Sequence, residues 1–308
     1  MNKRSHTAAS TDTSEDSPDL RSWLVLLLLS LIWGTSFILI KRGLEVYQPV
    51  QVACLRISIS ALAFLPILLY NLRKVDWTKW KALLLVGLTG SAVPAFLFAV
   101  AQTEVSSSIA GILNSLSPLF TLVLGVMFFG SRLVWKKVLG VFIGLLGAVM
   151  LILFGKSAGL EGNLWYGLLV IVATLCYATS VNVVGTFLKQ TSSLLISASA
   201  FVMVGPPAIL LLLSSNFTDL LLYEEGAWEA LGYIAILALA STVLASVIFF
   251  MLVKWTSPLF SSTVAYLVPV VALGWGAVDG EPITLLHGLG MALILSGVYL
   301  TRHSGKSL

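Results

Sequence analysis

Long apolar runs alternate with short polar segments along almost the whole chain. Charged residues and clusters of Gly, Pro and Asn divide the sequence into ten runs, each close to the roughly 20 residues that a helix needs to cross a bilayer. These runs are Ser22–Ile40, Pro49–Leu72, Ala82–Ala101, Ser107–Phe129, Val138–Gly155, Leu164–Leu188, Leu194–Ser214, Ala230–Val253, Leu259–Val278 and Leu285–Thr301. The pattern predicts an all-α integral membrane protein with ten transmembrane helices.

The composition agrees with a membrane protein. Of the 308 residues, 58% are hydrophobic and only 10% are charged, whereas a soluble domain carries about 25% charged residues. Residues 1–21 are polar and rich in Ser, Thr and Asp, which predicts a disordered tail, and residues 302–308 form a second short tail. Both cysteines, Cys54 and Cys176, lie inside apolar runs, so no structural disulfide is expected.

The Lys and Arg residues indicate how the spans are oriented. If the N-terminus is cytoplasmic, 14 of the 18 cations fall on the cytoplasmic side. Lys41, Arg42 and Lys156 fall on the other side, and Arg56 lies within a span. We expect a multi-pass protein of the bacterial inner membrane, in which the positive-inside rule places both termini in the cytoplasm. The net charge of +4 gives no reason to expect a nucleic-acid partner.

The two halves of the chain repeat one another. At an offset of 151 residues Pro118 meets Pro269, and at 144 the stretch "WGTS" (Trp33–Ser36) meets "YATS" (Tyr177–Ser180). The repeat predicts two units of five helices, residues 22–155 and 164–301. Because five is odd, the two units must enter the membrane in opposite senses. Inverted repeats are a transporter architecture, with the substrate site near the midplane between the halves.

Three stretches also resemble a known family. "LIWGTSFILIKRGL", "NSLSPLFTLVLGVMFFG" and "YLVPVVALGWGAVDGEPITLLHGLGMALILSGVYL" resemble the EamA-type branch of the drug/metabolite transporter superfamily, over about residues 22–301. The resemblance implies ten helices in two inverted EamA repeats and the export of small metabolites, amino acids among them. The family often has Gly-Glu after spans 4 and 9, but here only Gly280-Glu281 fits, because the first half has Gly130-Ser131.

Arg56 is the most informative candidate for a site residue. A charge within the membrane costs about 2.5 to more than 10 kcal/mol, so it should face a cavity or a partner. One interpretation is that Arg56 binds a substrate carboxylate. The other is that it is structural, either neutralising helix carbonyl groups or extending toward the membrane surface.

Aromatic and amide side chains complete the predicted binding site. Trp33 and Tyr177 occupy equivalent positions and combine an apolar ring with a polar group, which suits an amphipathic ligand. Asn114 and Tyr266 precede the mid-span prolines and are predicted to contact substrate, while packing remains the alternative for the aromatic residues. Further predicted lining residues are Gln102, Asn182 and Trp275. Pro118 and Pro269 are predicted hinges, since a mid-span proline frees a backbone carbonyl.

The sequence lacks the patterns of an enzyme. It has no HExxH, Walker or nucleophile-elbow motif and no cluster of His, Cys and carboxylates, so neither a metal nor a cofactor is expected. The prediction is a secondary transporter that exports a small amphipathic metabolite, an amino acid or related compound, as a monomer or a homodimer. The alternatives are a drug or nucleoside-type exporter of the same fold or, from another class, a non-transporting membrane subunit or enzyme.

The predicted topology can be tested by labelling. Single cysteines would replace Ser304 and one residue of the loop Ser215–Glu229, in a chain without Cys54 and Cys176. An impermeant maleimide added to intact cells should label the loop of an N-in, C-in protein and leave position 304 unlabelled until the membrane is opened. Labelling of position 304 from outside alone would refute this orientation.

Overall fold

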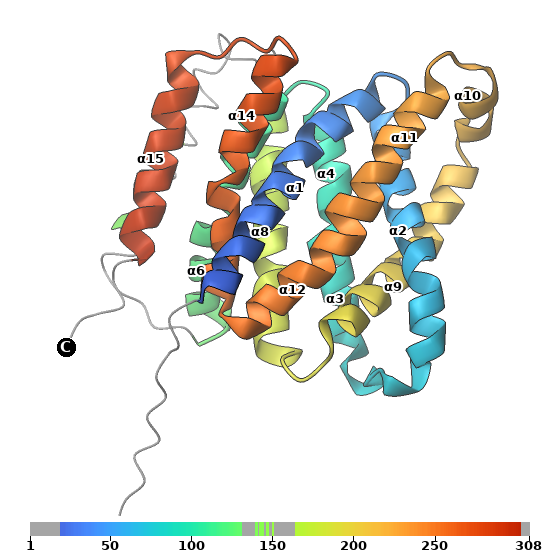
Figure 1. The fold of residues 1–308 in the computed structure, drawn as a ribbon, viewed down its shortest axis with the longest axis horizontal. Coiled ribbons are helices and arrows are strands. Elements are labelled where there is room, and N and C mark those ends of the chain that lie inside the picture. The colour runs from blue at the N-terminus through green and yellow to red at the C-terminus, as the bar shows by residue number, and fades with distance from the viewer. Residues whose placement is uncertain are drawn as a thin grey trace, which may run out of the picture.

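The computed structural model describes residues 19–130, 139–140, 142–144, 146–147, 150 and 164–302. Every element in these ranges is helical (Figure 1). The α-helices are α1 (Leu20–Leu44), α2 (Pro49–Asn71), α3 (Trp80–Gly87), α4 (Val93–Ala101), α5 (Ser107–Asn114), α6 (Ser117–Phe128), α8 (Leu164–Phe187), α9 (Ser193–Leu213), α10 (Phe217–Tyr223), α11 (Ala227–Ala238), α12 (Ala245–Trp255), α13 (Pro258–Ser262), α14 (Val268–Val278) and α15 (Leu285–Arg302). Two π-helical segments, Leu88–Ala92 and Leu239–Leu244, join α3 to α4 and α11 to α12. Short 3₁₀ turns occupy Leu72–Lys74, Trp77–Lys79 and Thr263–Tyr266.

Most of the predicted spans are present. Within the described ranges, eight helical stretches are long and apolar enough to cross a membrane, and Leu285–Gly297 in α15 is a shorter apolar stretch. The all-α membrane class is therefore confirmed. The predicted fifth span, Val138–Gly155, falls outside the described residues except at isolated positions, so the count of ten spans stays a prediction.

Equivalent spans of the two halves are interrupted at equivalent places. The third and eighth predicted spans each contain a π-helical segment, and the segments begin at Leu88 and Leu239, 151 residues apart. The fourth and ninth spans each break just before Pro118 and Pro269, which then occupy the first turn of α6 and α14. A proline is tolerated in a first turn because its missing N–H would have no partner in the helix there. The local irregularities thus follow the sequence repeat.

Packing between the helices follows the same repeat. The helix α1 contacts α11, α12 and α14, and its counterpart α8 contacts α3, α4 and α6, which are the equivalent elements of the other half. The counterparts α2 and α9 pack on each other, with the rings of Phe64 and Phe201 stacked at a centroid distance of 5.4 Å. In Figure 1, α2, α3 and α9 lie on the right and α14 and α15 on the left.

The first helices of the two halves end at opposite edges of the bundle. Tyr47, which follows α1, donates its hydroxyl to the carbonyl of Ala227 at the start of α11 (2.9 Å). Thr191, which follows α8, accepts a hydrogen bond through its carbonyl from Lys254 at the end of α12. Because α11 and α12 belong to one predicted span, the ends of α1 and α8 are separated by the length of that span. The start of α1 and the end of α15 lie at the same edge (Figure 1).

Close packing of α3 on α9 provides a test of the fold. A Cβ atom added to Gly87 would lie 2.5 Å from the carbonyl oxygen of Ala200, whereas one added to Gly232 would meet nothing within 4 Å. We expect Gly87→Ala to lower the free energy of unfolding of the detergent-solubilised protein by about 1–3 kcal/mol, as overpacking does. The matched variant Gly232→Ala should be neutral or slightly stabilising. Equal unfolding midpoints for the two variants would contradict the described packing.

Candidate substrate-binding site

A cavity lies between the two halves, lined by α1, α2, α4, α8, α9, α12, both π-helical segments and the breaks of the fourth and ninth spans. About 120 Å³ of it is accessible to the centre of a water molecule, and one water needs about 10–15 Å³ by this measure. The cavity therefore has room for a small organic molecule. Its aromatic lining residues are Trp33, Phe37, Phe98, Tyr177, Phe201, Phe249 and Phe250. Its side chains with hydroxyl or amide groups are Ser36, Asn114, Ser117, Thr121, Ser180, Ser241, Thr242, Ser246, Ser261 and Ser262.

Arg56 is the one charged residue among the described residues that line the cavity. It projects from α2, is partly buried, and donates its Nε–H to the hydroxyl oxygen of Thr242 at 2.8 Å. The phenol of Tyr177 lies beside the guanidinium. No carboxylate of the described chain forms an ion pair with Arg56. A cation without a counter-ion, held within the bundle, attracts an anionic group that enters the cavity.

Trp33 lines the cavity with its polar group already used within the protein. Its indole Nε1–H donates to the backbone carbonyl of Ser241 at 2.9 Å. Its ring packs edge-on against the ring of Phe249, with a distance of 4.9 Å between the ring centroids. Ser241 lies in the π-helical segment Leu239–Leu244. Trp33 therefore offers a ligand its apolar face rather than its donor.

Tyr177 and Asn114 also line the cavity. Tyr177 lies on α8, and its ring stacks on Phe98 with a centroid distance of 5.9 Å. Asn114 is the last residue of α5, and its side-chain amide has no hydrogen-bond partner among the described residues. Both can offer a polar group to a ligand, Tyr177 from beside the Arg56 guanidinium and Asn114 from the break in the fourth span.

Four other predicted lining residues lie outside the cavity lining. Gln102 is buried and donates to the carbonyl of Phe37 (2.9 Å), and Asn182 is buried and donates to the carbonyls of Thr121 and Ala178 (both 2.9 Å). Trp275 is 40% exposed and donates to the hydroxyl of Thr35, and Tyr266 packs against the apolar core. The amides of Gln102 and Asn182 thus satisfy backbone carbonyls, which stabilises the fold around the cavity.

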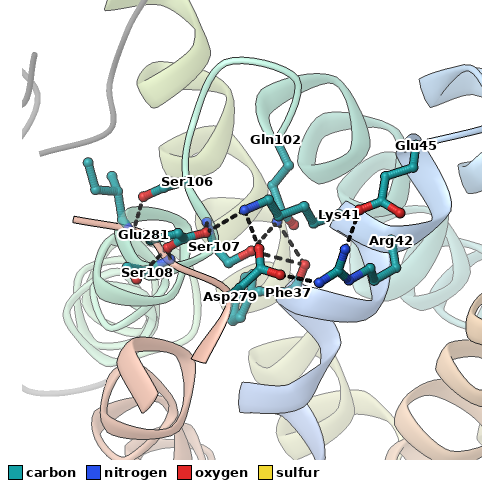
Figure 2. A network of polar contacts seen from close by, with 11 residues as sticks. Phe37, Lys41, Arg42, Glu45, Gln102, Ser106, Ser107, Ser108, Asp279 and Glu281 are labelled. Atoms are coloured by element: carbon teal, nitrogen blue, oxygen red, sulfur yellow. Dashed lines mark hydrogen bonds and ion pairs between the residues drawn. The ribbon is translucent and has the colours of Figure 1, made fainter. Parts of the chain in front are cut away.

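A network of ion pairs joins three helix ends at the edge where α1 ends (Figure 2). Asp279, directly after α14, pairs with both Lys41 and Arg42 of α1. Glu281 pairs with Lys41 at 3.3 Å. The side chains of the two acids are only 8% and 6% exposed, so removal of one partner would leave a buried charge uncompensated.

Glu281 also caps the N-terminus of α5. Its carboxylate oxygens accept hydrogen bonds from the backbone N–H groups of Ser107 (3.0 Å) and Ser108 (3.1 Å) and from the hydroxyl of Ser108 (2.6 Å). These backbone groups have no partner within their own helix, and the helix dipole favours a negative charge there. Gly280, with φ +80°, makes the turn that brings Glu281 back to α5. A single carboxylate therefore connects α1, α5 and the segment after α14.

The prediction from sequence missed this network and the role of Thr242. The signal for the network was present, since Lys41 and Arg42 are exceptions to the positive-inside count and Gly280-Glu281 fits the family pattern. The signal for Thr242 was weaker: Ser241 and Thr242 occupy the positions of Gly90 and Ser91 at the 151-residue offset, so that small polar residues recur there. Nothing in the sequence indicated the π-helical segments themselves.

The fold defines a polytopic helical membrane protein with a cavity between two similar halves. The sequence profile of the EamA-like transporter family matches residues 20–153 and again residues 164–302. The chain belongs to this family, as its sequence motifs indicated. The family points to a transporter rather than an enzyme, and a transporter of this kind works within a lipid bilayer on a small-molecule substrate.

Individual relatives agree over nearly their full length. An uncharacterized transporter of Archaeoglobus fulgidus is 26% identical over 282 residues, which are 91% of this chain and 98% of the relative. The uncharacterized inner membrane transporter YedA of Escherichia coli is 29% identical over 283 residues, 89% and 88% of the two chains. A probable amino-acid metabolite efflux pump of Escherichia coli is 28% identical over 291 residues, 90% and 93% of the two chains. One crystal structure shares the fold, with a TM-score of 0.63 at 18% identity over 92% of this chain and 96% of that one.

The network predicts how much Glu281 contributes to stability. We expect Glu281→Ala to lower the free energy of unfolding by about 1–3 kcal/mol, because two backbone donors of α5 and the charge of Lys41 lose a buried partner. Glu45, whose side chain is 51% exposed and pairs only with Arg42, supplies the control, and Glu45→Ala should change stability by less than about 0.5 kcal/mol. Equal thermal unfolding midpoints for Glu281→Ala and the parent protein in detergent would contradict the network.

Proposed function

We propose that this protein is a secondary transporter of the inner membrane that exports an amino acid or a related amphipathic carboxylate. The observation that carries the proposal is Arg56, a cation that has no counter-ion among the described residues and lines a cavity of metabolite size. The cavity wall is otherwise aromatic, aliphatic and hydroxyl-bearing. A ligand with one carboxylate and an apolar side chain matches this lining better than a cation or a purely apolar compound does.

A relative supports the same substrate class. The probable amino-acid metabolite efflux pump of Escherichia coli aligns with 90% of this chain. At 28% identity the alignment supports the general class of substrate, and the individual compound depends on the lining residues. In the proposed site Arg56 binds the carboxylate, Trp33 and Tyr177 supply ring surface, and Asn114 supplies a polar contact.

Alternating access between inverted repeats is the mechanism that we propose. Three observations support it: the family profile matches twice, equivalent spans break at equivalent positions, and α1 and α8 end at opposite edges of the bundle. Two halves that run in opposite senses can rock about a fixed central site and expose it to one side at a time. The breaks before Pro118 and Pro269 provide the hinges of this motion.

The ion-pair network closes the cavity at one end in this arrangement. With the N-terminus cytoplasmic, the end of α1 faces the outside, so Lys41, Asp279 and Glu281 would join the helix ends that must separate for release outward. Among the described residues, the opposite edge has no ion pair between different spans. We expect the outward-open state to require separation of this network.

The proposal is tested by transport into reconstituted vesicles. Purified protein would be assayed with a panel of radiolabelled neutral amino acids at concentrations below saturation. We expect uptake of at least one of them by the parent protein, and we expect Arg56→Gln to reduce that uptake about tenfold or more, because a hydrogen bond to a charged group contributes about 1.5–3 kcal/mol. Arg56→Lys should retain part of the activity, since it keeps the charge and changes the geometry.

Arg73 supplies the control for this experiment. It is exposed in the turn after α2, and Arg73→Gln should transport at the parental rate. Normal amounts of folded Arg56→Gln with normal uptake would refute the role of Arg56, and the absence of uptake for the whole panel would refute the substrate class.

A further inference from the structure

Arg56 donates a hydrogen bond to a hydroxyl group of the other half of the protein, that of Thr242, and the phenol of Tyr177 lies beside its guanidinium. Its Nε–H donates to Thr242 Oγ1 at 2.8 Å, and Thr242 is 4% exposed. The Thr242 hydroxyl donates its own proton to the carbonyl of Leu237 at 3.1 Å, so that only its lone pairs are directed at Arg56. Because the hydroxyl proton is used in this way, Thr242 acts toward Arg56 purely as an acceptor.

The π-helical segment produces this geometry. Thr242 lies in the π-helical segment Leu239–Leu244, and its hydroxyl reaches the carbonyl of Leu237 five residues earlier, which is the spacing of a π-helical turn. Such segments are rare and occur often at functional sites. The guanidinium is therefore fixed through Nε by a group whose own position is set by the backbone.

The other half of the protein has the same backbone without the cation. At the repeat offsets Thr242 corresponds to Ser91 in the segment Leu88–Ala92, and Arg56 corresponds to Ala200 on α9. Ser91 is 5% exposed, and its hydroxyl has no hydrogen-bond partner among the described residues. The equivalence is also seen in packing. Gly87 lies so close to α9 that an added Cβ would be 2.5 Å from the carbonyl oxygen of Ala200 and 3.0 Å from Val204. In the other half Ser60, the counterpart of Val204, donates its hydroxyl to the carbonyl of Ala238, the counterpart of Gly87.

From this comparison we infer that Thr242 is a positioning residue that orients Arg56 and so places the anionic end of the ligand beside the π-helical segment of the second half. The inference rests on the proposed function and adds the direction of the bound ligand. Because Thr242 accepts the hydrogen bond of Nε, the two terminal nitrogens of the Arg56 guanidinium can bind a carboxylate. The ligand's anionic group lies at Thr242, Arg56 and Tyr177, and its remaining part extends toward the uncharged segment at Gly90.

Removal of the Thr242 hydroxyl tests the inference. Thr242→Val keeps the shape of the side chain and removes the acceptor, Thr242→Ser restores the acceptor, and Ser91→Ala is the matched control in the other half. The probes are L-phenylalanine and phenethylamine, which has the same ring and amine without the carboxylate. We expect Thr242→Val to raise the KM for L-phenylalanine transport about tenfold and to leave the inhibition constant of phenethylamine unchanged. Thr242→Ser and Ser91→Ala should behave as the parent protein.

A second measurement needs no substrate. Phenylglyoxal modifies the terminal nitrogens of arginine, and peptide mass spectrometry gives its rate at Arg56. Thr242→Val should change this rate at least about threefold, whereas Ser91→Ala should leave it unchanged. An unchanged rate in Thr242→Val overturns the positioning role even if the transported compound is not L-phenylalanine.

In the transport experiment, equal losses for both probes in Thr242→Val would also overturn the positioning role, since they indicate a general structural defect. Absence of transport by the parent protein with every amino acid would instead refute the proposed function.

Discussion

Every backbone polar group within a bilayer has to be satisfied by the protein itself, and this constraint fixes where the spans can be irregular. The hydrocarbon interior has no water to pair with a freed carbonyl, so irregular helix is tolerated only where it is buried or lines a cavity. Here four spans are interrupted, and residues in or next to each break line the cavity, among them Gly90, Asn114, Ser241 and Ala265. The freed carbonyls have partners, as the bond from Trp33 to Ser241 shows. The interrupted parts of the spans therefore form part of the cavity lining.

The two halves share a backbone plan and differ in the side chains that they place on it. Arg56 corresponds to Ala200, and Trp33 corresponds to Tyr177. The polar group of Trp33 binds the protein's own backbone, while Tyr177 lies beside the Arg56 guanidinium. A symmetric cavity would bind a ligand equally in two orientations. Under the proposed function, the single charge of Arg56 would remove this degeneracy and favour a ligand with one anionic end.

The ends of most helices could be predicted from sequence, but the direction in which their side chains point could not. The predicted span Pro49–Leu72 agrees with α2 at Pro49–Asn71, because polar residues at the membrane surface determine where an apolar run ends. A membrane helix is apolar on all sides, so no stripe indicates which side faces inward, and one residue turns the helix by about 100°. Trp33 and Arg56 were predicted to line the cavity, and both do so in the structure. Gln102 and Asn182 were also predicted to line it, but their amides bind backbone carbonyls beside it.

Contacts between distant helix ends are a different problem, because they depend on how the halves pack. Lys41 and Glu281 are each visible in the sequence at the end of an apolar run, but only the packing of α1 beside α14 brings them together. The repeat gives no indication of this contact either, because the first half has Ser131 at the position of Glu281 and so lacks the carboxylate.

That same difference gives the network a functional consequence. If both ends of the cavity were closed by equivalent contacts, the two access states would have similar free energies. Among the described residues, ion pairs between different spans occur at one end only, and under the proposed mechanism they would stabilise the state in which that end is closed. A ligand shifts such an equilibrium only by the difference in its affinity for the two states. Under the proposed function, a substrate bound by Arg56 would have to gain enough binding free energy in the opposite state to offset separation of Lys41 from Asp279 and Glu281. The proposed function would therefore link the single charge of the cavity lining to the ion-pair network, because the free energy of the first must balance that of the second.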